Sequence, residues 1–148
     1  MRYWEDFTPG EVFELGSRTI TREAIVDFAA QWDPQPFHLD EQAGAQSSFG
    51  GLVASGWHTA GLCMRLYVDA LLLDAASQGS PGLEELRWTA PVRPGDTLTV
   101  RLTVLESRPS STNPGRGTLL LRWEATNQDG LLVLHMTGRG MFGRRKAA

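Results

Sequence analysis

The chain has 148 residues, which corresponds to one domain of ordinary size. Its 14 basic and 17 acidic residues give a net charge of −3, which argues against a general nucleic-acid-binding protein. One cysteine excludes an internal disulfide framework, and three histidines leave little for a histidine-based metal cage, so we expect no metal. Glu5 and Asp6 stand where a signal peptide would be apolar, and we therefore expect a cytoplasmic enzyme or binding domain.

Residues 52–73 form an apolar stretch that is long enough to span a bilayer. Its second half contains Arg65 and Asp69, each of which would cost about 2.5–3.5 kcal/mol near the centre of an inserted helix. A Leu, Ile, Phe or Val returns only about 0.3–0.6 kcal/mol. We therefore interpret the stretch as a buried helix with no membrane partner, in which Arg65 and Asp69 can neutralise each other at i,i+4 spacing.

The first half of the chain is predicted to be mainly helical. Thr21 is a candidate N-cap for a helix whose apolar side chains recur at helical spacing up to Trp32. Asp33 precedes a proline, so this helix must end at about that residue. Asp40 can begin a further helical turn before the long apolar helix.

The second half of the chain shows the two-residue alternation of half-buried strands. The clearest alternation covers residues 97–104, 118–126 and 132–136, and further strands are predicted over residues 12–20 and 84–92. Asp129-Gly130 predicts a tight hairpin in which both turn residues have positive φ. Residues 107–117, rich in Ser, Pro and Gly, are expected to form one long loop.

Strands gathered after one long helix indicate an α+β domain rather than alternating βαβ units. An antiparallel sheet can lay one face on the long helix and wrap it. Because this helix is apolar nearly all round, we expect it to be enclosed.

The segment from Asp33 to His38 is the most informative in the chain. It places a carboxylate and an imidazole five residues apart, across a bend that Pro34 and Pro36 stiffen. Such a pair can hold a water molecule and exchange protons with it. The same residues could instead stop the helix and make only local hydrogen bonds, and spacing alone does not decide between the two.

A second candidate site lies at the start of the long helix, where Ser55 is the expected N-cap and Gly56 occupies the first turn. Helix N-termini present unpaired N–H groups, and glycine permits close approach to the backbone. This combination would suit a developing oxyanion. An ordinary cap followed by a packing glycine would show the same residues.

The remaining reactive residues have simpler interpretations. His58 is expected to be a hydrogen-bonded core histidine, His135 to face solvent from a strand, and Cys63 to be a small core residue. The basic residues 144–146 are expected to form a solvated tail that could also help to hold an anionic ligand.

Three segments resemble MaoC-like dehydratases, which are similar to the (R)-specific enoyl-CoA hydratases and have the hot-dog fold. They are residues 28–38, 49–59 and 86–96, and the resemblance extends over about residues 3–142. It implies an α+β hot-dog domain over residues 1–148, with an antiparallel sheet around one long central helix and a short basic tail at 143–148. It also implies a homodimer or higher homo-oligomer, whose contact would cover an exposed strand edge.

The hydratase signature reads Gly-Asp-x-Asn-Pro-x-His, and Asp33, Pro36 and His38 match its Asp, Pro and His. By this resemblance Asp33 and His38 are the catalytic dyad. Trp32 replaces the signature glycine, and Gln35 replaces the asparagine with an amide one methylene further from the backbone.

The resemblance also makes the Gly56 amide the oxyanion donor and places Gln35, Ser55 and Trp57 at the substrate-binding site. A serine that some hydratases carry along the helix is Met64 here. The implied activity is reversible hydration of a trans-2-enoyl-CoA, with coenzyme A as part of the substrate and no other cofactor. A hot-dog acyl-CoA thioesterase and a non-catalytic acyl-CoA-binding subunit are the alternatives.

Overall fold

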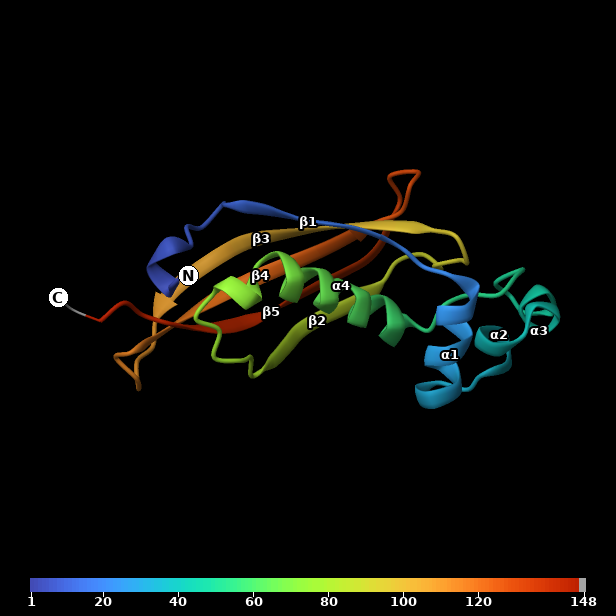
Figure 1. Ribbon diagram of the computed structural model, residues 1–148, viewed down its shortest axis with the longest axis horizontal. Coiled ribbons are helices and arrows are strands. Elements are labelled where there is room, and N and C mark those ends of the chain that lie inside the picture. The colour runs from blue at the N-terminus through green and yellow to red at the C-terminus, as the bar shows by residue number, and fades with distance from the viewer. Residues whose placement is uncertain (147–148) are drawn as a thin grey trace.

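The structure, a computed structural model, describes residues 1–146 and consists of one antiparallel sheet with helices on one side and at one end (Figure 1). The five strands are arranged in the order β1-β3-β4-β5-β2. This arrangement confirms the predicted α+β class. The strands are β1 (Val12–Thr19), β2 (Gly82–Trp88), β3 (Thr97–Pro109), β4 (Arg116–Thr126) and β5 (Leu132–Gly143).

The predicted helix starts after Thr21, Asp40 and Ser55 and the predicted end of the first helix at Asp33 are confirmed. The Thr21 hydroxyl caps α1 (Arg22–Trp32) by accepting from the Ala24 N–H, and Asp33 is the C-cap residue. The Asp40 carboxylate caps α3 (Glu41–Gln46) in the same way, through the Ala43 N–H. The remaining helical segments are α2 (Pro36–Leu39), the long α4 (Gly56–Ala70) and the short 3₁₀ turns η1 (Trp4–Asp6) and η2 (Leu72–Asp74).

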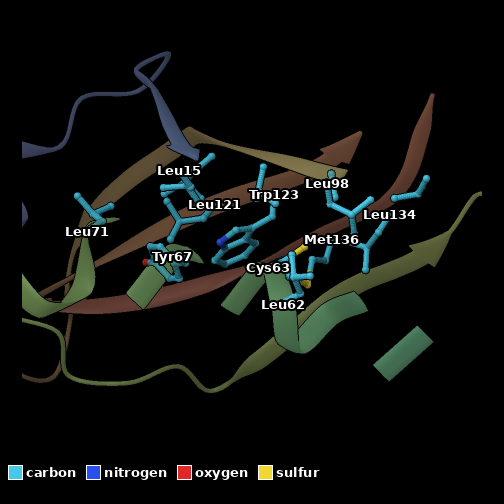
Figure 2. Close-up of a cluster of buried hydrophobic side chains, with 14 of the residues drawn as sticks. Leu15, Leu62, Cys63, Tyr67, Leu71, Leu98, Leu121, Trp123, Leu134 and Met136 are labelled. Carbon is cyan, nitrogen blue, oxygen red and sulfur yellow. The ribbon is translucent and has the colours of Figure 1, made fainter. Parts of the chain in front are cut away.

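The core lies between α4 and the inner face of the sheet (Figure 2). Tyr67 of α4 packs edge-on against Trp123 of β4, with ring centroids 5.3 Å apart. Cys63 is fully buried, and burial raises the pKa of its thiol to about 12. It is therefore the inert core residue that the sequence predicts. The alternating inward residues of β3 are also fully buried: Leu98, Val100, Leu102 and Val104.

The sheet packs around one side of α4, as predicted for a hot-dog domain, and leaves the opposite side of the helix open. Trp57 and Met64 lie on an open face of the helix and are 59% and 48% exposed. Arg65 and Asp69 lie on the surface too, paired as predicted at 2.8 Å. Five strands cover only one side of a helix, so its other side stays open in a single chain. No helix within residues 1–146 is long and apolar enough to cross a membrane.

The strand boundaries differ from the predictions at three places. The loop expected over residues 107–117 is short, because β3 and β4 stay paired as far as Pro109 and Gly117. β5 runs to Gly143 rather than ending near Met136. The strand predicted over residues 84–92 ends at Trp88, after which the chain turns toward α4 and Val92 accepts a hydrogen bond from the Ala54 N–H.

The turn between β4 and β5 is not the tight hairpin that was predicted, because only Gly130 of the Asp129-Gly130 pair has positive φ, at 76°. The Gly130 N–H donates to the Asn127 carbonyl, and the Asn127 side chain accepts from the Asp129 and Leu131 N–H groups. The loop is therefore longer than a two-residue hairpin turn, and the Asn127 side chain accepts hydrogen bonds from backbone amides within it.

Arg144 and Arg145 pair with the N-terminal segment, although Arg145 stays exposed to solvent. The Arg145 guanidinium donates two hydrogen bonds of 2.7 Å to the Asp6 carboxylate. The Arg144 guanidinium lies 5.1 Å from the centre of the Trp4 ring and pairs with Glu5. These contacts use the charges of both arginines within the fold.

Candidate active site

A cleft of about 530 Å³ opens at the N-terminus of α4, between α2, the end of β2 and residues 89–92. Its walls are formed largely by aromatic side chains, and its polar groups gather where α1 ends and α4 begins. The aromatic residues are Phe37, Phe49, Trp57 and Trp88, and the polar ones are Asp33, Gln35, His38, Thr59 and Thr89.

The structure brings Asp33 and His38 together in this cleft. Asp33 is the C-cap of α1 and His38 lies in the single turn of α2, so the bend between the helices turns the two side chains toward each other. The His38 Nε2 atom is 3.3 Å from the Asp33 Oδ2 atom. The imidazole is buried, whereas the carboxylate keeps 18% of its surface exposed.

A backbone carbonyl determines which nitrogen of His38 carries the proton. His38 Nδ1 lies 2.7 Å from the carbonyl oxygen of Val53, which can only accept a hydrogen bond. In the neutral ring Nδ1 is therefore the donor, and the lone pair of Nε2 faces Asp33. Two acceptors then face one position, at which a water molecule can donate one hydrogen to each.

Gln35 orients the carboxylate of the pair. Its side-chain amide donates a 2.7 Å hydrogen bond to Asp33 Oδ1, which leaves Oδ2 directed at His38. Partial burial raises the pKa of Asp33, but the Gln35 amide, the Ser55 hydroxyl and the charge of His38 in its protonated form together hold this pKa below its usual value. Asp33 is therefore ionised at neutral pH, and the longer glutamine side chain reaches the carboxylate.

The first turn of α4 borders the same cleft. The Gly56 N–H makes no hydrogen bond among the described residues, as expected for the first amide of a helix. The Trp88 indole donates a 2.8 Å hydrogen bond to the Gly56 carbonyl. Its ring packs so closely on Gly56 that a Cβ atom there would overlap the ring.

Comparison with known proteins identifies the family of the chain. Residues 6–120 match the model of the MaoC-like domain family. The chain belongs to this family.

The relatives named here are similar to the chain over most of its length. The chain is 38% identical to Protein MaoC of Klebsiella aerogenes, over 69% of this chain and 30% of that protein. It is 34% identical to 3-hydroxybutyryl-CoA dehydratase of Methylorubrum extorquens, over 72% of the chain and 66% of that protein. The structure of a MaoC-like dehydratase from Rhodospirillum rubrum superposes with a TM-score of 0.89 at 40% identity, covering 99% of this chain and all of the other. The fold is accordingly the hot-dog fold.

The three residues predicted to bind substrate do not all line the cleft. Gln35 and Trp57 line the cleft, whereas the side chain of Ser55 is fully buried behind its wall. Met64, at the position of the family serine, lies on the open face of α4 and not in this cleft.

His58 lies on the other side of α4, away from the dyad. Its ring stacks on Phe28 with centroids 4.7 Å apart, and burial lowers its pKa. Its Nδ1 atom has no hydrogen-bond partner among the described residues, so it is not the hydrogen-bonded core histidine that was expected. His135 is half-buried rather than facing solvent, and its Nδ1 atom is likewise unpaired within residues 1–146.

The sequence reasoning missed the aromatic wall of the cleft. Trp88 lies within the resembling segment 86–96 but was given no role, although its ring covers Gly56 and its N–H donates to the Gly56 carbonyl. Phe37 and Phe49 lie on either side of α3 in the chain, and their rings meet at 5.2 Å. The signals in the sequence were Phe37 and Phe49 near helix ends and Trp88 at the end of a predicted strand region, but their common wall depends on the tertiary arrangement.

The contact between Gly56 and Trp88 predicts that Gly56→Ala destabilises the protein by about 1–3 kcal/mol, the usual cost of overpacking. Gly61 on the same helix is exposed with open space around its Cα, so Gly61→Ala should stabilise by about 0.5–1 kcal/mol. Denaturant unfolding of both variants measures the difference. A Gly56→Ala variant as stable as Gly61→Ala would show that the Trp88 ring does not restrict this position.

Proposed function

We propose that the protein catalyses the reversible addition of water across the C2–C3 double bond of a trans-2-enoyl-CoA thioester. The observation that carries the proposal is the pair of acceptors, Asp33 Oδ2 and His38 Nε2, 3.3 Å apart beside the free N-terminus of α4. The name of the Methylorubrum relative, a 3-hydroxybutyryl-CoA dehydratase, supports a reaction of this class.

In the proposed hydration the dyad holds a water molecule against C3 of the enoyl group. The water oxygen bonds to C3, one of its protons passes to the dyad, and the electrons of the double bond move toward the thioester oxygen. The dyad then returns a proton to C2, so that one water is consumed and nothing is released. Dehydration is the same sequence in reverse.

The charge that develops on the thioester oxygen needs a donor, and the proposed one is the Gly56 N–H. This amide has no other partner among the described residues and lies at the positive end of the α4 dipole. No metal or redox cofactor takes part in this scheme.

The side chains that line the cleft favour an uncharged acyl group as the substrate. His38 is the one basic side chain among the residues that line it, and its Nδ1 already binds the Val53 carbonyl. A carboxylated acyl chain would therefore meet aromatic and aliphatic walls without a counter-charge.

Loss of either dyad member should abolish most of the activity. We expect Asp33→Asn and His38→Ala each to lower kcat about 10²–10⁴-fold on crotonyl-CoA, as for other acid–base groups. The double variant should be little worse than the worse single one, because the two residues act as a unit. The loss of enoyl absorbance measures the rate.

Two variants on other surfaces serve as controls. Asp27→Asn removes an exposed carboxylate of α1, and His135→Ala removes an imidazole of β5, so both should keep full activity. Full activity in a folded Asp33 or His38 variant would disprove the dyad. Release of free thiol from the substrate would identify a thioesterase, and neither reaction would indicate a non-catalytic acyl-CoA-binding subunit.

The oxyanion role of Gly56 needs a test that adds no Cβ atom, since even proline at this position would strike the Trp88 ring. Semisynthesis can replace Gly56 by glycolic acid, which exchanges its N–H for an ester oxygen. We expect kcat to fall about 10²–10³-fold, the usual effect of losing one oxyanion donor, with little change in KM. An unchanged kcat would leave Gly56 as a packing glycine.

We also propose that the chain is a homodimer. β2 is an outer strand of the sheet, and its apolar side chains Leu83 and Trp88 are 48% and 44% exposed. Met64 on the open face of α4 is also 48% exposed. A two-fold contact would cover this edge together with the open face of α4. Light scattering at micromolar concentration should give twice the chain mass, and Leu83→Glu should lower it. A monomeric wild-type protein would refute the dimer.

A further inference from the structure

Ser55 begins α4 without capping it. The two comparable N-cap residues, Thr21 and Asp40, each accept a hydrogen bond from an amide of the helix that they precede. The Ser55 side chain makes no such bond, although serine is among the preferred N-cap residues. Its hydroxyl therefore does not stabilise the first turn of α4.

The hydroxyl is also fully buried. Ser55 has 0% of its surface exposed, and its Oγ atom has no hydrogen-bond partner among the described residues. Burying an unpaired hydroxyl is costly, so such a group in a folded protein calls for an explanation. Because it cannot reach the cleft surface, its explanation must lie in a neighbouring residue rather than in direct contact with substrate.

The neighbour is Asp33. Ala54 and Gly56, on either side of Ser55 in the chain, line the same cleft as Asp33, which places the buried hydroxyl beside the dyad. The Ser55 hydroxyl is also among the groups that hold the Asp33 pKa below its usual value. An ionised carboxylate can accept about four hydrogen bonds, and Gln35 uses one of these positions on Oδ1. The titratable group that faces Asp33 is His38 of α2, while Gln35 and Ser55 are neutral.

We infer that Ser55 is a positioning residue whose hydroxyl donates to the Asp33 carboxylate and, with Gln35, keeps it ionised and directed at His38. The inference rests on the proposed function for its catalytic consequence. The effect of Ser55 on the pKa of Asp33 does not depend on that function and can be measured without substrate. Gln35 acts from the bend before α2 and Ser55 from the start of α4, so the carboxylate is held from two elements.

The test compares Ser55→Ala with Thr21→Ala, which also removes an N-cap hydroxyl but one that caps its helix. Carbon-13 NMR titration of the aspartate carboxyl groups, with Asp33 assigned through Asp33→Asn, gives the Asp33 pKa without any substrate. Ser55→Ala should raise that pKa by about one unit, because a hydrogen bond to the charged form is lost. Thr21→Ala should leave the Asp33 pKa unchanged while lowering Tm by several degrees.

The catalytic consequence appears in the pH dependence of kcat/KM on crotonyl-CoA. Activity needs ionised Asp33, so the acid limb of the profile should move to higher pH in Ser55→Ala and stay in place in Thr21→Ala. If Ser55→Ala does not fold, Ser55→Gly removes the same hydroxyl at a position where glycine is accepted.

Two results would overturn the inference: an unchanged Asp33 pKa in the Ser55 variants, or an equal shift in Thr21→Ala. A shifted pKa in a protein that does not hydrate enoyl-CoA would leave the inference standing and refute the proposed function instead.

Discussion

The candidate site depends on one hydrogen bond, between His38 Nδ1 and the carbonyl oxygen of Val53. It joins α2 to the segment that leads into α4, and the Val53 N–H reinforces the junction by donating to the Phe37 carbonyl. The same bond sets the tautomer of His38, so its other nitrogen is an acceptor toward Asp33. A single contact thus positions the dyad at the helix N-terminus and selects its protonation pattern.

Packing explains the glycine at the start of α4 independently of any oxyanion role. Trp88 closes the end of β2 over Gly56, and its N–H anchors the Gly56 carbonyl. The close contact excludes a side chain, while the anchor holds the first turn of the helix against the sheet. Glycine at position 56 thus both leaves its N–H accessible and permits the close contact with Trp88. Only a change confined to the backbone can test the first role without disturbing the second.

The sequence predicted the N-caps of α1 and α3 and the proximity of Asp33 and His38, because these features depend on local chemistry. Thr21 and Asp40 cap as their residue types suggest, and the prolines around Gln35 end one helix and start another. The features that the sequence did not predict depend on contacts between residues that are distant in the chain or on the detailed conformation of a turn. β3 and β4 stay paired into the predicted loop, as far as Pro109 and Gly117. The Asn127 side chain reshapes the turn that Asp129-Gly130 was expected to form. Nothing local in residues 144–146 indicates their ion pairs with the N-terminus, more than 130 residues away.

The two departures from the family signature leave the hydrogen bond to the Asp33 carboxylate in place. The Gln35 amide still reaches the carboxylate in place of the asparagine, because the bend before Pro36 lets a longer side chain fold back on Asp33. Trp32, in place of the signature glycine, is the last residue of α1 and is 72% exposed, so its bulk points away from the site. Substitutions that look disruptive in the signature thus occur where the structure has room for them. The residues without such room are Gly56 under Trp88 and His38 against the Val53 carbonyl, and these are two of the residues on which the proposed chemistry depends.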